Sequence, residues 1–352
     1  MSALKIETRD LLKVVDRFSE PSILVLGDII LDRYLWGDVE RICPEAPVPV
    51  VDVKRTSLML GGAGNVAANL RTFGARVSVL TCVGKDAGGR EVKRLLGDMG
   101  VEGDEGLIED NDRQTTEKTR VVARHQQMVR FDRETRNIIS DMTAGKIFQC
   151  LEKQWADFDA ILISDYGKGM ISPALFKQIK KLNGRQPKLV TVDPKERNIG
   201  LYKKVSLITP NKKEAAYAAG KEIETEEDLK EVGKKMIREL QCENLVITLG
   251  GDGMAFFRRD GEFLKIPTFA REVFDVSGAG DTVISTITLA LCCGATFPQA
   301  IILANYAAGV VVGKVGTASV TPDELRTYIG VEKRHEHSKK TTSCEVRREY
   351  HL

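Results

Sequence analysis

The stretch DVSGAGDTVISTITLAL, residues 275–291, joins a cluster of small residues to a long apolar helical pattern. Gly278 and Gly280 let main-chain amides approach a ligand closely, and a helix start adds unpaired N–H donors with partial positive charge. Such a turn suits a phosphate group or a developing phosphoryl charge. Asp281 would be repelled there unless it accepts a proton from a hydroxyl that attacks the phosphate, so it is the predicted catalytic base. A helix-capping aspartate is the structural alternative.

Apolar runs of strand length alternate with helical patterns along most of the chain on either side of this stretch. The alternation predicts an α/β fold, with a mostly parallel central sheet and helices on both faces. The predicted strands are 23–31, 77–83, 160–164, 189–193, 205–208 and 245–249, and the predicted helices are 64–73, 88–99, 173–182, 214–219, 278–291 and 298–312. Thr321 to Glu324 has the pattern of a capping box that starts a further helix.

Two segments do not fit this alternation. Residues 41–60 are rich in proline and valine, which suits short edge strands, and residues 115–133 alternate apolar and polar side chains. We expect them to form a small lid sheet over the active site, with strands within about 33–60 and 113–133. The predicted organisation is one domain over residues 1–330, followed by a charged, flexible tail at 331–352.

Composition disfavours several classes of protein. The 52 basic and 50 acidic residues leave a net charge of +2, which provides no electrostatic footprint for nucleic acid or an acidic membrane. No apolar stretch approaches the roughly 20 residues of a membrane span, and the start does not resemble a signal peptide, so we expect a cytoplasmic protein. The seven cysteines form no CxxC pair, and only His125 lies outside the tail, which argues against zinc and histidine-triad chemistry.

Two further motifs contain candidate ligand groups. The glycine cluster GGAGNVAAN, residues 61–69, satisfies a dinucleotide fingerprint through Gly62, Gly64 and Ala67, but the next predicted strand does not end in the acid that would bind a ribose. Asn211 and Glu214 form an NxxE at a strand end. Two oxygen ligands one helical turn apart can hold water on Mg²⁺ beside a triphosphate, although a capped helix explains the same pair.

Together these motifs resemble the two signatures of the ribokinase/PfkB carbohydrate kinases, with the NxxE between them, over roughly residues 21–330. Further segments resemble the kinases that phosphorylate heptose 7-phosphate in the supply of ADP-heptose for bacterial lipopolysaccharide. They are VLGD (25–28), LDRY (31–34), RICPEAPVPV (41–50), QQ (126–127), SDYGKG (164–169) and DPK (193–195). Cys43 stands in the third of these where a serine is expected.

The resemblance implies a role for each matching residue. Asp281 is the base, and the amides of Gly278, Ala279 and Gly280 form an anion hole. ATP contacts Lys195, Asn211, Glu214, Thr248, Gly250, Gly253, Ser277, Asn305 and Ala308, with Val312 at the adenine and Mg²⁺ held through water by Asn211 and Glu214. The sugar contacts Asp28, Asp32, Gly61, Gly62 and Asn65, and the two aspartates are alternatively bonded to nearby amides.

A phosphorylated sugar also requires cations, because Arg and Lys bind phosphate strongly. The candidates are Lys118, Arg120, Arg124, Arg130, Lys168 and Lys195, with Gln127 beside the sugar. Each of these cations, taken alone, is equally explained as an ordinary solvated charge.

The resemblance implies an ATP- and Mg²⁺-dependent homodimeric kinase that phosphorylates the C1 hydroxyl of D-glycero-D-manno-heptose 7-phosphate, without nucleic-acid or membrane partners. A requirement for a monovalent cation stays open. The alternatives are a related kinase for another sugar or sugar phosphate, a nucleotide-binding relative without catalysis, and a nicotinamide-binding protein. Many relatives carry a nucleotidyltransferase domain after the kinase, and this chain ends in a short tail, so we expect kinase activity alone.

Overall fold

The structure is a computed structural model that describes residues 6–101, 106–124, 126–270, 273–314, 316, 318–338 and 347–350, with the backbone alone from residue 331 onward. Its centre is a ten-stranded sheet in the order β14-β13-β12-β11-β10-β9-β8-β1-β4-β5. Neighbours from β11 to β5 pair in parallel, and β12, β13 and β14 are antiparallel additions at one edge. The strands are β1 (Ser22–Gly27), β4 (Arg76–Gly84), β5 (Leu107–Asp110), β8 (Ala160–Ser164), β9 (Leu189–Asp193), β10 (Leu207–Ile208), β11 (Asn244–Thr248), β12 (Met254–Arg258), β13 (Glu262–Ile266) and β14 (Arg347–Tyr350). The predicted mostly parallel sheet is confirmed.

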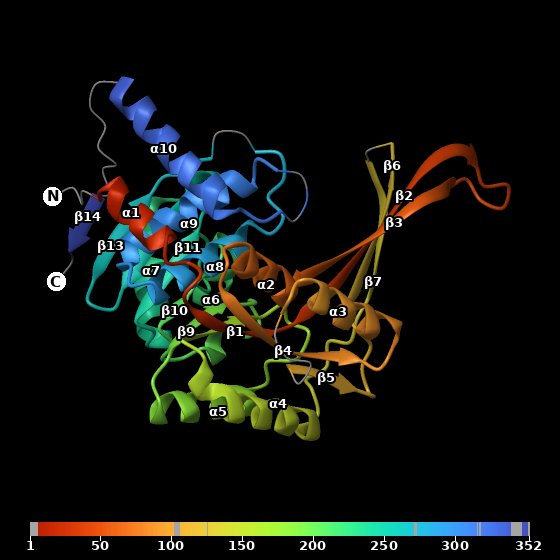
Figure 1. The fold of residues 1–352 in the computed structure, drawn as a ribbon, viewed down its shortest axis with the longest axis horizontal. Coiled ribbons are helices and arrows are strands. Elements are labelled where there is room, and N and C mark those ends of the chain that lie inside the picture. Colours follow the sequence, from red (N-terminus) through yellow and green to blue (C-terminus); the bar gives the residue numbers. More distant parts are fainter. Residues whose placement is uncertain are drawn as a thin grey trace.

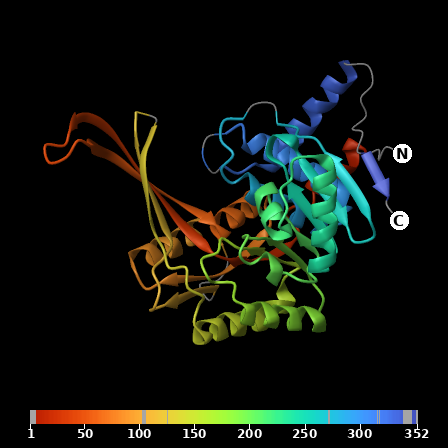
Figure 2. The ribbon, with the colours of Figure 1, turned by 180° about the vertical axis from the view of Figure 1, so that it is seen from behind.

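Helices cover both faces of this sheet, as Figures 1 and 2 show. One core contains side chains of α1 (Thr8–Val15), α2 (Ala63–Thr72), α3 (Ala87–Asp98), α8 (Ala279–Cys292), α9 (Phe297–Val311) and α10 (Pro322–Ser338). The other contains side chains of α4 (Asp141–Gln154), α5 (Pro173–Arg185), α6 (Lys212–Ala219) and α7 (Glu226–Leu240). Strand β1 directs Ile23 and Val25 into the first core and Leu24 and Leu26 into the second. Each buried side chain of this size stabilises the fold by about 1.5–3 kcal/mol.

A second sheet of four strands projects from the end of the body opposite to β14 (Figure 1). Its order is β3-β2-β6-β7, and we call it the lid sheet. Its strands are β2 (Ile29–Ile42), β3 (Pro49–Gly62), β6 (Glu117–Ala123) and β7 (Gln126–Arg133). The predicted separate small sheet is therefore present. The short strands predicted within 41–60 are wrong, because β3 is a single edge strand of 14 residues in an equally long hairpin with β2.

The single strand predicted over 23–31 is also wrong, since the chain breaks at Asp28 and enters a different sheet. Strand β1 ends at Gly27, where any Cβ atom would overlap with the carbonyl of Ser164, and β2 starts at Ile29. Asp28 lies between them and uses its side chain to bond the loop that follows β8. Residues 23–31 thus contribute to a strand of each sheet, and Asp28 and Asp32 lie near the point where the two sheets meet.

The C-terminal part differs from the predicted boundary at residue 330. Helix α10 starts with the predicted capping box, in which Thr321 and Glu324 bond each other's amides, and continues to Ser338. Strand β14 then pairs with β13. The rest of the predicted tail, 339–346 and 351–352, lies outside the described residues, as does His125. Within the part of the chain that is described, no helix combines the length and the apolar character needed to cross a membrane.

Candidate active site

Asp281 lies in the first turn of α8, and only 3% of its surface is exposed. Its Oδ2 accepts a hydrogen bond from Nδ2 of Asn65 at 2.7 Å, and its Oδ1 accepts one from the hydroxyl of Tyr166 at 2.9 Å. Burial raises the pKa of Asp281 to about 6, the charge of Asp32 adds to the rise, and the two hydrogen bonds oppose it. The carboxyl lines a cavity of about 220 Å³ at the carboxyl edge of the large sheet. A group of this pKa in a cavity can accept a proton near neutral pH.

The start of α8 has the geometry predicted for an anion site. Gly278 precedes the helix with φ 80° and ψ 0°, a left-handed conformation that glycine adopts without strain, and no side chain caps the helix. The amide of Ala279 bonds the carbonyl of Val276 at 3.3 Å. The amides of Gly280 and Asp281 lie in the first turn, where a helix supplies no acceptor, and Gly278 and Gly280 line the cavity. An anion in the cavity would therefore meet main-chain donors.

Asn211 and Glu214 line the same cavity and also form a capping box at the start of α6. The capped helix is therefore confirmed, and the same two side chains also line the cavity. Nζ of Lys195 lies 3.0 Å from Oε1 of Glu214. Across the cavity, burial raises the pKa of Asp193 well above its usual range, and the nearby charges of Asp281 and Glu214 raise it further. A cation in this cavity would relieve the repulsion among these carboxylates.

A second cavity of about 350 Å³ opens beside the first and is mainly apolar. Its lining includes most residues predicted at the nucleotide, namely Thr248, Gly250, Gly253, Asn305, Ala308 and Val312, together with Ala279 and Gly280 of the anion-binding turn. Thr248 and Gly280 belong to both cavities, so the two are joined. An apolar cavity continuous with a phosphate-binding turn suits a purine nucleotide. Ser277 is not part of either lining and is exposed on the loop before α8.

The glycine cluster, residues 61–69, brings the remaining residues that were predicted to contact the sugar together beside Asp281. Any Cβ atom at Gly61 would overlap with Oδ2 of Asp32, and one at Gly62 would overlap with the carbonyl of Asp28. Asn65, one helical turn further, bonds Asp281. The motif therefore builds a tightly packed floor that contacts Asp32 through Gly61 and Asp281 through Asn65.

Asp28 has the alternative role anticipated for a strand-end aspartate. Its Oδ2 accepts main-chain hydrogen bonds from Tyr166 and Lys168, both at 2.9 Å, and its Oδ1 accepts one from Met170 at 3.2 Å. Burial raises the pKa of Asp28 to about 6, and the charge of Asp165 contributes. Asp28 therefore braces the loop after β8 and lines neither cavity.

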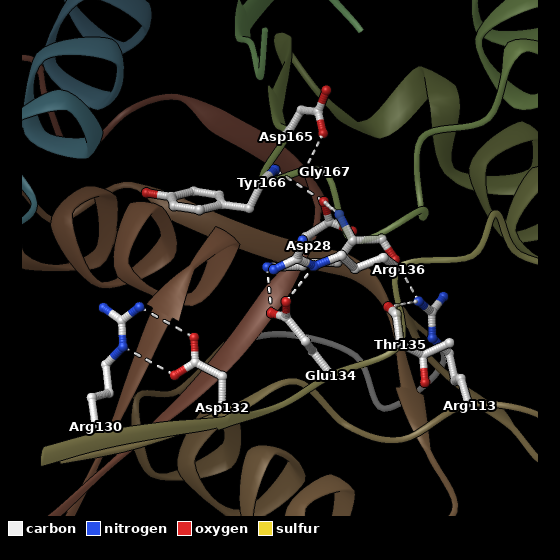
Figure 3. Close-up of polar contacts among 11 residues, drawn as sticks. Asp28, Arg113, Arg130, Asp132, Glu134, Thr135, Arg136, Asp165, Tyr166 and Gly167 are labelled. Atoms are coloured by element: carbon white, nitrogen blue, oxygen red, sulfur yellow. Dashed lines mark hydrogen bonds and ion pairs between the residues drawn. The ribbon is translucent and has the colours of Figure 1, made fainter. Parts of the chain in front are cut away.

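The predicted phosphate-binding cations lie mainly on the lid sheet and the adjoining loops. Arg120 pairs with Asp32 and lies over the ring of Tyr34, and Lys168 pairs with Glu134. Arg130 pairs with Asp132 at 3.0 Å (Figure 3). Lys118 is half-buried and, among the described residues, has no carboxylate partner. Gln127 is exposed on β7, and Arg124 donates to the carbonyl of Val39 at 2.9 Å. Among the predicted cations, all of which lie in the described part of the chain, Lys118 is therefore the one whose side chain forms no ion pair or hydrogen bond.

The comparisons with known proteins agree with this geometry. Residues 20–324 match the model of the pfkB family of carbohydrate kinases. The chain belongs to this family. As a pfkB carbohydrate kinase it is an enzyme of sugar phosphorylation, which sets aside the nicotinamide-binding alternative.

Relatives in this family extend over most of the chain. The bifunctional protein HldE of Citrifermentans bemidjiense is 45% identical over 325 residues, which are 92% of this chain and 66% of that protein. HldE of Geobacter metallireducens is 47% identical over 309 residues, 88% of this chain and 63% of that protein. The chain therefore spans just under two thirds of the length of these relatives.

Solved structures of more distant proteins share the fold. Ribokinase of Arabidopsis thaliana, complexed with ribose and ATP, has a TM-score of 0.68 at 19% identity and covers 88% of this chain and 98% of its own. Phosphofructokinase-2 of Escherichia coli, in complex with substrates and products, has a TM-score of 0.72 at 18% identity, with coverage of 89% and 100%. The predicted ribokinase-like fold is confirmed.

Two residues of this pfkB kinase enter the site without having been predicted there. Tyr166 bonds the carboxylate of Asp281, and Asp193 faces Glu214 and Lys195 across the cavity. Both lie at the carboxyl ends of buried strands, β8 and β9, the edge at which ligands bind to open parallel sheets. Their position was the available signal, since Asp193 is the last residue of β9 and Tyr166 lies two residues after β8.

Proposed function

We propose that this chain transfers the γ-phosphoryl group of ATP to the C1 hydroxyl of D-glycero-D-manno-heptose 7-phosphate. The observation that carries the proposal is the buried Asp281 at the start of α8, in a cavity that joins an apolar nucleotide-sized cavity. The motifs shared with heptose 7-phosphate kinases and the likeness to proteins named HldE support the choice of sugar. We place the enzyme in the cytoplasm, where ATP is available.

In the proposed reaction, Asp281 accepts the proton of the C1 hydroxyl. The hydroxyl oxygen forms a bond to the γ-phosphorus while the bond from that phosphorus to the β-phosphate oxygen breaks, which gives the 1,7-bisphosphate and ADP. The first-turn amides of α8 would stabilise the charge that develops on the transferred group. A well-placed general base typically contributes about 10²- to 10⁴-fold to the rate.

Asn211 and Glu214 would hold Mg²⁺ through water, with Asp193 facing the same space. The donors fit a hard cation, since they are oxygen atoms in a strongly acidic cavity. In the described ranges, no group of three or more His, Cys, Asp or Glu side chains is arranged to hold a metal directly. Mg²⁺ would neutralise charge on the phosphates.

The inner face of the lid sheet, formed by Asp32, Tyr34, Lys118, Arg120 and Arg130, would bind the phosphorylated end of the sugar. Strand register puts Lys118 beside Asp32, and Arg120 between Tyr34 and Arg130. The charge of Asp32 reaches Asp281, so this face is directed at the base. Burial lowers the pKa of Lys118, the charges of Asp32 and Asp132 oppose this, and the nearby Lys168 and Arg130 add to the lowering.

The outer face of the lid sheet, where Val129 and Phe131 are exposed beside the Arg33–Glu117 ion pair, would be covered by a second copy of the chain. Register pairs Leu35 and Val129 with Val121, and Phe131 is 55% exposed. Exposed apolar clusters of this kind mark interaction surfaces. We therefore propose a homodimer through the lid sheet.

A substrate panel tests the choice of sugar. Initial rates with heptose 7-phosphate, ribose, fructose 6-phosphate and adenosine should show the highest kcat/KM for heptose 7-phosphate. A preference for ribose or adenosine would refute a phosphorylated substrate, and a preference for fructose 6-phosphate would keep the phosphate but change the sugar.

Asp281→Asn tests the base. The variant should bind ATP with unchanged affinity and lose kcat by about 10²- to 10⁴-fold, because an amide cannot accept the proton. Steady-state rates at saturating substrates and nucleotide titration measure the two quantities. Asp260→Asn, an exposed acid in the turn after β12, is the matched control. A kcat within threefold of the unmodified enzyme would remove Asp281 from the mechanism.

A further inference from the structure

The loop after β8, residues 165–170, contacts both the catalytic carboxylate and the residues that end the lid sheet. At one end, the hydroxyl of Tyr166 donates to Oδ1 of Asp281 at 2.9 Å. At the other, the ammonium of Lys168 pairs with Glu134, directly after β7 (Figure 3). Two parts of the molecule far apart in sequence therefore meet through a few residues.

Tyr166 is suited to orient Asp281 and not to react. Burial raises the pKa of its hydroxyl well above the usual range, and the charge of Asp281 raises it further, so the phenol keeps its proton. It then donates to the carboxylate at all physiological pH values. With Asn65 bonded to Oδ2, both oxygens of Asp281 are held and the rotation of the carboxylate is restricted.

The backbone that carries Tyr166 is itself fixed. The carboxylate of Asp28 accepts hydrogen bonds from the main-chain amides of Tyr166, Lys168 and Met170. Gly167 and Gly169 have φ of 67° and 90°, which glycine alone adopts easily, and any Cβ atom at Gly169 would overlap with the carbonyl of Asn137. These contacts therefore hold the loop together as one unit.

The same unit is attached to the end of the lid sheet by more than one contact. A guanidinium nitrogen of Arg113 donates to the carbonyls of Lys168, at 2.6 Å, and Thr135, at 3.2 Å. Glu134 pairs with Lys168 and also with the exposed Arg136. Figure 3 shows these side chains gathered between β7 and the loop. A displacement of the strand end would pull on Lys168 and, through the braced loop, on Tyr166.

We propose that Tyr166 is a positioning residue for Asp281, and that the Glu134–Lys168 ion pair couples the position of the lid sheet to the orientation of this base. The inference rests on the proposed function, in which Asp281 is the base and the sugar phosphate binds the lid sheet. Its consequence is that a lid sheet in the wrong place leaves the base misdirected, so phosphoryl transfer to water is suppressed when no sugar is bound.

The charged groups facing Asp281 determine the expected pH dependence. Asp32 approaches from β2, Tyr166 from the loop after β8 and Asp193 from the end of β9, and the cavity is also lined by Asp165, Lys195 and Glu214. Among these, Tyr166 lowers the pKa of Asp281 by its hydrogen bond. Because the base must be ionised, activity falls as the pH drops through this pKa, and loss of the hydroxyl should move the fall to higher pH.

Tyr166→Phe tests the positioning role. We expect kcat at pH 7.5 to fall about tenfold, the midpoint of the acidic fall in kcat to rise by about one pH unit, and KM for ATP to stay unchanged. Tyr217→Phe removes the same atom from an exposed tyrosine on α6 and should change none of these. A wild-type pH profile in Tyr166→Phe, with Asp281→Asn inactive, would overturn the positioning role. An active Asp281→Asn would instead overturn the proposed function.

Glu134→Gln tests the coupling. It should lower kcat about threefold to tenfold, and it should raise ATP hydrolysis in the absence of sugar. In combination with Tyr166→Phe it should cost little more than Tyr166→Phe alone, because both act on one unit. Arg136→Gln, which removes the exposed partner of Glu134, is the matched control. Rate losses that multiply in the double variant, or sugar-free hydrolysis at the wild-type rate, would overturn the coupling.

Discussion

The central sheet and the lid sheet differ in how far their side chains are buried. Every residue of β8 is buried, whereas every residue of β7 is exposed. The large sheet is held by two apolar cores that leave its carboxyl edge rigid, and there Asp281 is fixed by two hydrogen bonds. The lid sheet carries ion pairs on both faces, Arg120 with Asp32 and Arg33 with Glu117, and leaves Val129 and Phe131 exposed. In the proposed function, the packed region carries the chemistry, and the exposed one selects the sugar and the partner.

This contrast is sharpest between Asp28 and Lys118. Asp28 is buried with its carboxylate saturated by three main-chain donors, and Lys118 is half-buried with no carboxylate partner in the ranges that the structure describes. Substitution of the first should damage the fold, and substitution of the second should damage recognition. Three substitutions, in order of decreasing effect, test this separation.

Asp28→Asn should lower the free energy of unfolding by about 3 kcal/mol, because its amide NH₂ would face main-chain donors and leave them unsatisfied. Urea unfolding followed by circular dichroism at pH 7.5 measures the loss. Asp98→Asn, an exposed acid on α3, should cost less than about 1 kcal/mol. If the two variants were equally stable, the loop after β8 would not depend on Asp28, and the contrast between the regions would fail.

Lys118→Met should raise KM for the phosphorylated sugar about 10- to 100-fold, since it removes one charge-assisted hydrogen bond to phosphate. KM for ATP and the melting temperature should stay unchanged. Lys54→Met, on the edge strand β3, is the matched control, because Lys54 is exposed and paired with Asp52. An unchanged KM for the sugar phosphate would place the phosphate away from the inner face.

Phe131→Asp should weaken dimerisation about tenfold, because it introduces an uncompensated charge into an apolar contact. Analytical ultracentrifugation over a concentration series measures the dissociation constant, and kcat per subunit should change by less than twofold. Tyr217→Asp places the same charge on an exposed aromatic of α6, remote from the lid sheet. Equal behaviour of the two variants would remove the outer face from the interface.

The sequence predicted the central sheet and the start of α8 because these depend on local patterns. Apolar runs of strand length and the glycine-rich turn fix them without reference to distant residues. The chain break at Asp28 was missed because the apolar residues 23–26 and 29–31 are separated only by Gly27 and Asp28, and it is the carbonyl of Ser164 and the amides after β8 that force the turn. Helix α7 was recognisable in principle, since Thr225 and Asp228 form a capping box before an amphipathic pattern.

The state of each charged residue could not be predicted in the same way. Whether Lys118, Arg120 or Lys168 is paired depends on strands and loops that meet only in the folded molecule. Tyr166 is a similar case, because its bond to Asp281 joins residues 115 positions apart. Sequence patterns identify which side chains can do chemistry, and tertiary contacts decide which of them are free to do it.

The floor formed by Gly61 beneath Asp32 restricts how this enzyme can diverge in evolution. Even one added methyl group at Gly61 would overlap with Oδ2 of Asp32 and displace this aspartate, so under the proposed function mutations that reshape the floor would lower turnover before they alter substrate choice. Charged residues on the exposed strands of the lid sheet can be replaced without such an overlap. New specificities within this lineage should therefore arise by exchange of lysines and arginines on the projecting sheet, while the glycines stay fixed.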